Sequence, residues 1–536
     1  MDRSEIVVLV LAAVLGVGGL FAVAGGPVSW DELLYMDLSA EPRADPSVLN
    51  RYVHIYAQSL FMTMAGSPLD GARLYWAFLM VASGVLTYAV ARRFTPSSTA
   101  LTGVVAVGLL ASQYLIAYYA GATYADFTVM VIGLVALVFY LWALDRPVLF
   151  LPYVGLGACL YLAARAKETG AALAVLAIGA VFLVPSFGRP EPFRRIAALA
   201  VGGGAALVAM ACVDGLLLGD VLFSVRPSSW AALGEFNLGR TYDRTAENWF
   251  GEIGSTELML LFTLFLASAW RLDLDRARRW VWMLPLALLA LLVYTMVFGA
   301  FGVIPRYFLP VYPVLAVLAA QLFRFDLYRM RQVWPWWLGA GAVAVVFIAG
   351  TAMIFLGARD AGWEVRDYWR AIVFPLGLIA LLALMVWVRK WSAGPASAAL
   401  VAVAVLAAPT LAGGIDHIRR LDAPDSRFGP FVALEEPLST LGPEQRIFVS
   451  RAIYRDTGML GRNRYATKWM YTVYFDRLIE VEQIDFGEIR DLDPGAVDFV
   501  LVTAEEAREL SDVARAVEEA DGVVLLAPHT VLREAA

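Results

Sequence analysis

The sequence predicts an α-helical polytopic membrane protein of about thirteen transmembrane helices followed by a small soluble α/β domain. The chain of 536 residues is 60% hydrophobic and 17% charged, and its mean hydropathy is +0.66. A soluble protein carries about 25% charged residues. Apolar runs long enough to cross a bilayer recur along most of the chain, whereas charged residues gather in short loops and in roughly the last 120 residues. These observations indicate an integral membrane protein.

The predicted transmembrane helices are the long apolar runs, of roughly 17 or more residues in most cases. The first run is long enough to span the bilayer, so we interpret it as an uncleaved first helix rather than a signal peptide. The predicted helices cover residues 5–25, 72–91, 98–116, 126–144, 148–165, 169–186, 195–218, 257–270, 280–299, 307–323, 335–357, 370–388 and 396–414.

Basic residues in the short connections predict the orientation in the plasma (inner) membrane. With the N-terminus in the cytoplasm, almost every short cytoplasmic connection is basic, as the positive-inside rule requires. An odd number of helices then places the C-terminal region on the outer, extracytoplasmic side. The basic residues are Arg92, Arg93, Arg146, Arg189, Arg194, Arg195, Arg271, Arg276, Arg278, Arg279, Arg324, Arg329, Arg331, Arg389 and Lys390.

Four segments are expected at the outer face. Residues 26–71 contain adjacent acids and, from Pro46 on, a pattern that predicts an amphipathic helix lying in the interface. The turn 118–126 ends in an acid, residues 219–256 carry mixed charges among aromatics, and residues 301–308 place an arginine where a helix begins.

The C-terminal composition is that of a soluble domain. We assign residues 1–414 to a transmembrane domain and 415–536 to an extracytoplasmic α/β domain. Its predicted strands cover 446–450, 478–482, 498–503 and 522–526, and Thr503 to Glu506 has the pattern of a capped helix start. Because this C-terminal domain contains no Gly-rich phosphate loop, we favour a lid or recognition role for it.

Composition also argues against several classes of protein. The net charge of −6 provides no basic stripe for a nucleic acid. The three histidines lack zinc-ligand spacing. Cys159 and Cys212 both fall in apolar segments, where we expect small core residues without a disulfide or metal role.

Several ordered pieces within residues 1–325 resemble the GT-C glycosyltransferases, particularly the protein O-mannosyltransferases and the lipid A aminoarabinose transferase. The pieces are Asp31-Glu32 after the first helix, the stretch from Arg51 to Tyr56, Asp126, Lys167 within Ala164–Gly170, and the run Pro305–Pro313. Two pieces depart from the family pattern. Val53-His54-Ile55-Tyr56 stands in place of Pro-Pro-Leu-Tyr-Tyr, and Lys167-Glu168 stands in place of Lys-Gly.

The resemblance implies an enzyme that takes a sugar from a polyprenyl-phosphate carrier and transfers it to an acceptor hydroxyl at the outer face. It places the catalytic base of an inverting single displacement at Asp31. Glu32 would either hold a divalent cation, Mg or Mn, or orient the acceptor. Asp126 would be a second acid in the site and a further candidate metal ligand, or the N-cap of the helix that it enters.

The leaving phosphate needs cations, because it gathers negative charge. We expect Arg306, Arg51 and Lys167 to bind it. Two alternatives stay open: Arg306 could extend to the interface, and Lys167 could pair with Glu168 or Asp126.

Other side chains are expected near the substrate: Tyr56, His54, Tyr124 and Glu168. For His54 we favour an interfacial aromatic over a general base. The expected partners are the lipid-linked donor, a glycan, lipid or protein acceptor and membrane lipids, with no nucleic acid. A flippase or transporter of lipid-linked sugars, or a non-catalytic assembly protein, is the alternative; Asp214 and Lys167 are the intramembrane ionisable candidates for such a path.

Overall fold

The computed structural model places parts of the chain from residue 35 to residue 528. Asp31, Glu32, the predicted helices 5–25, 257–270, 335–357, 370–388 and 396–414, and most of the segment 219–256 lie outside the described residues. The described residues are 35–36, 38–44, 51–66, 68–95, 100–111, 116, 123–185, 191–223, 275–297, 305–321, 446–450, 480–484, 499–512, 514–520 and 523–528.

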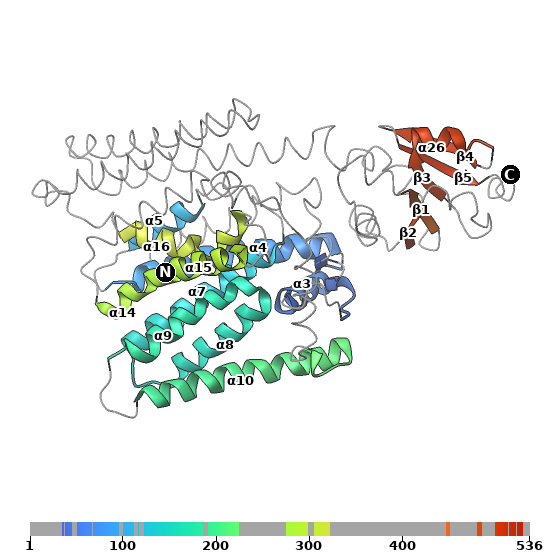
Figure 1. Cartoon of the computed structure of the whole chain (residues 1–536). Coiled ribbons are helices and arrows are strands. Elements are labelled where there is room, and N and C mark those ends of the chain that lie inside the picture. The colour runs from blue at the N-terminus through green and yellow to red at the C-terminus, as the bar shows by residue number, and fades with distance from the viewer. Residues whose placement is uncertain are drawn as a thin grey trace, which may run out of the picture.

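Helices run side by side through the first part of the chain (Figure 1). Eight of the predicted transmembrane segments coincide with helices of this part of the chain. Three of them, over Asp70–Arg93, Ala125–Asp145 and Glu191–Leu218, are long and apolar enough to cross a membrane. The helices are α3 (Tyr52–Ala65), α4 (Pro68–Arg93), α5 (Ala100–Ala111), α7 (Ala125–Asp145), α8 (Leu151–Ala166), η2 (Glu168–Leu173), α9 (Ala174–Phe182), α10 (Glu191–Leu218), α14 (Arg276–Arg279), η4 (Trp280–Trp282), α15 (Met283–Val297), η5 (Pro305–Val311) and α16 (Tyr312–Ala320).

A single extended residue separates the fifth and sixth predicted helices. Helix α8 ends at Ala166, Lys167 has φ −168° and ψ 151°, and the 3₁₀-helix η2 begins at Glu168. One extended residue redirects the chain without a loop.

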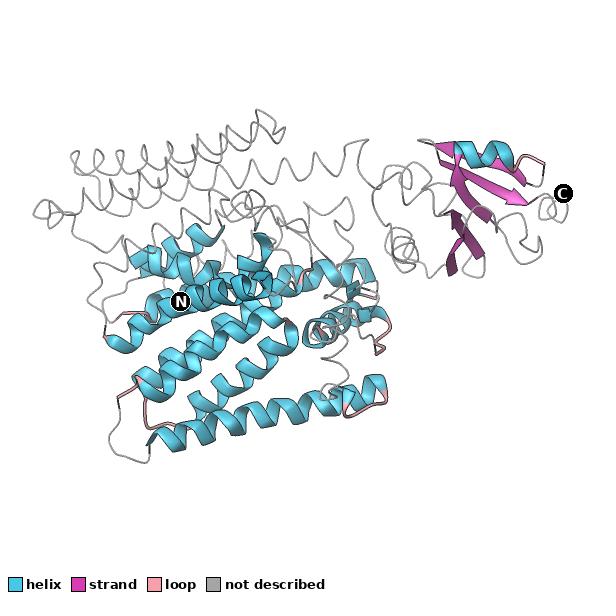
Figure 2. Cartoon of the chain, in the orientation of Figure 1, coloured by secondary structure: helices cyan, strands magenta, loops and turns pink. Residues whose placement is uncertain are grey.

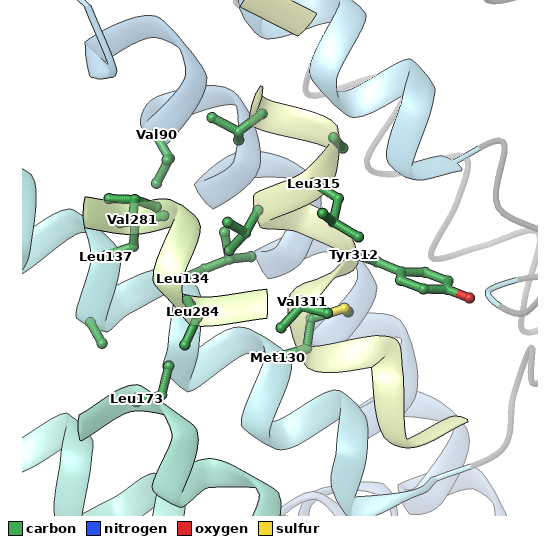
Figure 3. Packing of buried hydrophobic residues seen from close by; sticks show 14 of the residues in the cluster. Val90, Met130, Leu134, Leu137, Leu173, Val281, Leu284, Val311, Tyr312 and Leu315 are labelled. Atoms are coloured by element: carbon green, nitrogen blue, oxygen red, sulfur yellow. The ribbon is translucent and has the colours of Figure 1, made fainter. Parts of the chain in front are cut away.

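The main apolar core lies among α4, α5, α7, α8, α9, α15 and α16. Figure 3 shows part of it, with labelled side chains from α4, α7, α15 and α16. Helix α16 is buried over its whole length, from Tyr312 to Ala320, as expected for a helix that is apolar on all sides. Helix α10 instead buries one stripe with a spacing of three to four residues. Its members are Arg195, Ala198, Gly202, Ala206, Met210 and Asp214.

Glycines bring α8 and α10 into backbone contact. A Cβ atom on Gly157 would lie 2.1 Å from the Leu199 carbonyl oxygen, and one on Gly202 would lie 1.9 Å from the Val154 oxygen. Membrane helices associate through such small residues because apolar burial gives them little driving force in lipid. The crossing of α8 and α10 is therefore set by two glycines.

The loops predicted to share one side of the membrane gather at the same end of the bundle. At the end near α14, Arg278 forms an ion pair with Asp145 at 2.9 Å, and Arg195 donates to the carbonyl oxygens of Val184 and Pro185. Helix α3 and the C-terminus of α10 lie at the opposite end (Figure 1). The segregation of loops agrees with the prediction, and the side of the membrane that each end faces stays a prediction.

The described C-terminal residues form a mixed five-stranded sheet of order β2-β1-β3-β5-β4 (Figure 2). Strand β1 pairs in parallel with β2 and β3, whereas β5 is antiparallel to β3 and β4. Helix α26 (Ala504–Glu509) begins with the predicted capping box of Thr503 and Glu506. The extent 415–536 of a separate domain stays a prediction. The strands are β1 (Arg446–Ser450), β2 (Glu480–Ile484), β3 (Phe499–Thr503), β4 (Ala514–Ala520) and β5 (Val523–Pro528).

Candidate functional site

Asp126 is a fully buried carboxylate in the first turn of α7. The N-cap of this helix is Tyr124, which makes no side-chain capping bond, so the N-cap interpretation of Asp126 was wrong. A negative charge in the first turn is stabilised by the helix dipole. Burial of a charge still requires a cation nearby.

Lys167 provides that cation. Its Nζ atom donates to both carboxylate oxygens of Asp126, at 2.7 and 2.6 Å, and lies 4.1 Å from the centre of the Tyr307 ring. Burial lowers the pKa of Lys167 to about 8, and the charge of Asp126 opposes that shift. The sequence left open whether Lys167 pairs with Glu168 or with Asp126, and in the structure it pairs with Asp126.

Arg306 approaches the same carboxylate from η5. Its Nε atom lies 3.8 Å from Asp126 Oδ2, and its guanidinium lies 4.1 Å from the centre of the Tyr124 ring. The residue is only 8% exposed. The side chain is thus buried against an acid and an aromatic ring rather than extended outward.

Arg51 and Glu168 form a second ion pair beside the first. The guanidinium donates to both Glu168 oxygens, at 3.0 Å from Nη2 to Oε1 and in a short contact from Nη1 to Oε2, while Nε donates to the Tyr35 hydroxyl at 3.1 Å. Burial disfavours ionisation of Glu168, but the charge and hydrogen bonds of Arg51 outweigh it and lower the pKa of Glu168 to about 2. Lys167 and Arg51 also interact electrostatically.

These two ion pairs and Arg306 form what we call the cationic cluster: Arg51, Asp126, Lys167, Glu168 and Arg306. It contains three cations and two carboxylates, which leaves one net positive charge among five largely buried side chains. A buried excess of positive charge suits an anionic group with several oxygens, such as a phosphate.

Helix α3 faces the cationic cluster with polar side chains. His54 Nδ1 shares a hydrogen bond of 2.8 Å with Thr128 Oγ1, and Gln58 Nε2 donates to Thr123 Oγ1 at 3.0 Å. Both residues are fully buried, whereas Leu60 and Met64 on the outward side are 59% and 67% exposed. The buried side of α3 thus combines these polar residues with apolar ones, among them Ile55 and Met62, and the predicted place of the helix in the membrane interface stays a prediction.

The burial of His54 determines its protonation. Desolvation lowers the pKa of His54 to about 3, which leaves the imidazole neutral near pH 7. The ring packs edge-on against Tyr35, with centroids 5.1 Å apart. His54 is therefore a buried, hydrogen-bonded residue, and the expectation of an interfacial aromatic was wrong.

Tyr124 and Tyr56, which were also predicted near the substrate, lie in different surroundings. Tyr124 stacks beneath Arg306, whereas the Tyr56 hydroxyl donates to Asp214 Oδ1 on α10 at 2.7 Å, away from the cationic cluster. Asp31 and Glu32 lie outside the described residues. Sequence reasoning missed Thr128 and Gln58, because a lone threonine or glutamine within a helix carries no pattern that marks it.

The predicted divalent cation finds no ligand set among the described residues. No three His, Cys, Asp or Glu side chains of this part of the chain gather in one place. Both oxygens of Asp126 already accept from Lys167. The described residues therefore do not fit a cation site, and the role of Glu32 as a ligand stays a prediction.

Solved structures identify the architecture. The chain is similar to ArnT from Cupriavidus metallidurans bound to undecaprenyl phosphate, with a TM-score of 0.61 and 13% sequence identity over 98% of each chain. The apo state of that ArnT gives a TM-score of 0.58 and 16% identity, again over 98% of each chain. The chain has the fold of this ArnT.

The GT-C resemblance seen in the sequence is therefore confirmed for the fold. It extends beyond residues 1–325 to nearly the whole chain. No protein-family model matches the sequence, and the search of curated proteins found no match. Identities of 13% and 16% establish a shared GT-C architecture and leave substrate and chemistry to the site itself.

Proposed function

We propose that this protein is a membrane glycosyltransferase that moves a sugar from a polyprenyl-phosphate carrier to an acceptor hydroxyl. The observation that carries the proposal is the cationic cluster, with three cations and two carboxylates largely buried at one end of an apolar helix bundle. A lipid-linked phosphate has its tail in the bilayer and its head at the bilayer boundary. That is where such a cluster can neutralise it.

Arg306 and Lys167 are the proposed phosphate ligands. Arg306 supplies a planar fork that matches two phosphate oxygens, and Lys167 supplies a compact positive charge. Asp126 contacts both cations and holds them side by side. Arg51 already forms a bidentate pair with Glu168, so it would bind the phosphate only by dividing its N–H donors between that carboxylate and the phosphate.

The proposed chemistry is an inverting single displacement with Asp31 as the base. The acceptor oxygen attacks the anomeric carbon and loses its proton to Asp31 as the bond from that carbon to the phosphate oxygen breaks. The phosphate leaves with the electron pair, and nearby cations stabilise its added charge. Glu32 orients the acceptor.

Support for the donor comes from the shared fold, because the similar ArnT was solved with undecaprenyl phosphate bound. The acceptor is a glycan, lipid or protein hydroxyl. We place the enzyme in the plasma (inner) membrane with its N-terminus in the cytoplasm, in line with the basic loops of the sequence.

The test uses the full chain reconstituted in liposomes with a panel of radiolabelled sugars linked to undecaprenyl phosphate. Asp31→Asn should lower sugar transfer or hydrolysis by at least about 100-fold, because it removes the base. Asp70→Asn is the matched control, since Asp70 is an exposed carboxylate paired with Arg73 on α4. It should keep wild-type activity.

The outcomes separate the alternatives. Transfer that persists in Asp31→Asn contradicts the base assignment. Movement of the labelled lipid across sealed vesicles, without any transfer, would establish a flippase instead. Neither transfer nor movement across the whole panel would favour a non-catalytic assembly role.

A further inference from the structure

A buried polar contact on α3 lies outside the cationic cluster. The Tyr56 hydroxyl donates to Asp214 Oδ1 at 2.7 Å, across 158 positions of sequence. Asp214 is fully buried and occupies the last place of the otherwise largely apolar stripe that α10 turns toward its neighbours. A carboxylate in an apolar helix is costly unless its contacts serve a purpose.

The surroundings of Asp214 preserve this contact. Arg165, buried on α8, and Asp214 both act electrostatically on Tyr56. Burial, together with the hydrogen bond and charge of Asp214, raises the pKa of Tyr56, so its hydroxyl stays protonated and remains a donor. The contact therefore persists over the physiological pH range.

Helix α3 makes polar contacts with three separate elements. Arg51, just before the helix, contacts Glu168 of η2, His54 contacts Thr128 of α7, and Tyr56 contacts Asp214 of α10. Since a helix turns by about 100° per residue, side chains at these spacings leave α3 in different directions. Contacts in different directions fix both the position and the rotation of a helix.

The two ends of α3 are held differently. At the C-terminal end, Gly66 adopts φ +76°, and a Cβ on Gly71 of α4 would lie 2.2 Å from Met62 Cα, so α3 and α4 are in backbone contact. Near the N-terminal end, the polar contacts of Arg51, His54 and Tyr56 fix the helix. Loss of one of them should loosen the end that carries Arg51.

We propose that Asp214 is a positioning residue: by accepting from Tyr56 it holds α3 against α10, and so keeps Arg51 at Glu168 within the cationic cluster. The structural part of this inference, that Asp214 positions α3, does not depend on the proposed function. Its consequence for phosphate binding rests on the proposed function.

Hydrogen–deuterium exchange of the full chain in detergent tests the structural part. Tyr56→Phe removes the donor and should speed exchange of amides within Tyr52–Ala65 by roughly tenfold. Asp214→Asn keeps an acceptor oxygen and should give a smaller increase. Tyr161→Phe is the matched control, because its hydroxyl is buried near the same groups with no hydrogen-bond partner among the described residues. Unchanged exchange in Tyr56→Phe, or an equal change in Tyr161→Phe, overturns the inference.

Binding of undecaprenyl phosphate tests the functional part. Tyr56→Phe should raise its dissociation constant by roughly tenfold in the wild-type background and leave it nearly unchanged in an Arg51→Gln background. Equal effects in both backgrounds would show that Tyr56 does not act through Arg51, and would overturn the inference. If the wild-type chain binds no undecaprenyl phosphate, the proposed function fails, while the exchange experiment still decides whether Asp214 positions α3.

Discussion

Lys167 Nζ donates to both carboxylate oxygens of Asp126, at 2.7 and 2.6 Å, although the two residues are 41 positions apart in sequence. The pair joins the first turn of α7 to the single extended residue between α8 and η2. Both residues are almost completely buried. Each buried charge is therefore stabilised chiefly by the other.

Removal of one member of this pair should destabilise the protein strongly. Lys167→Met leaves the Asp126 carboxylate buried without its closest cation, and we expect a loss of about 3–5 kcal/mol in the free energy of unfolding. Reversible unfolding in mixed micelles with increasing SDS measures this loss. Lys167→Met combined with Asp126→Leu should cost less than Lys167→Met alone, because no carboxylate is left behind. Asp70→Asn, in an exposed pair, should change stability by less than about 0.5 kcal/mol.

Arg306 should not be replaceable by lysine. Arg306→Lys keeps the charge but loses the planar fork and the stacking on Tyr124, so we expect the affinity for undecaprenyl phosphate to fall about tenfold. Arg278→Lys, at the opposite end of the bundle, should leave it unchanged. An equal loss in both variants would point to a general effect on the fold.

The crossing of α8 and α10 should not tolerate one added methyl group. A Cβ at position 202 would lie 1.9 Å from the Val154 carbonyl oxygen, so Gly202→Ala must push the helices apart and should cost about 1–3 kcal/mol. Gly204 lies on the same helix, and a Cβ added there would meet no atom within 4 Å. Gly204→Ala should therefore be neutral or stabilise the protein by up to about 1 kcal/mol. Unfolding in SDS would show whether the two variants differ as expected.

The buried His54 should make stability depend on pH. Its folded pKa is about 3, below the ordinary 6.5, so between these values the unfolded chain binds a proton that the folded chain does not. Stability should thus fall as the pH drops from 6.5 toward 3, and His54→Gln should remove this component. Unfolding of both proteins across a pH series measures it. A difference between them that stays constant below pH 6.5 would contradict the assignment.

Many features of the site could be anticipated from the chain. Asp126, Lys167 and Arg306 each stand where an apolar run begins or ends, so their placement at one end of the bundle follows from the spacing of the helices. The pairing could not be anticipated, because the sequence offers Lys167 two acids, Asp126 and Glu168. The chain direction at the break after Ala166 decides that it meets Asp126, while Glu168 meets Arg51.

Tyr56 and His54 show the same limit. The sequence places both on one helix near the proposed substrate, yet one contacts α10 and the other contacts α7. A helix turns neighbouring side chains to different sides, and which side meets which neighbour depends on how the whole bundle packs. Thr128 and Gln58 become recognisable only once those neighbours are known.

By itself, the sequence determined the membrane class, the positions of the eight predicted helices that the structure describes and which of the described loops share one end of the bundle. These properties follow from hydrophobicity and charge along short stretches, which act locally. Only the tertiary structure decided which buried charges meet, in the pairs Lys167–Asp126 and Arg51–Glu168 and in the contact of Tyr56 with Asp214. Those contacts join residues 41, 117 and 158 positions apart, so they depend on helix packing that no local pattern encodes.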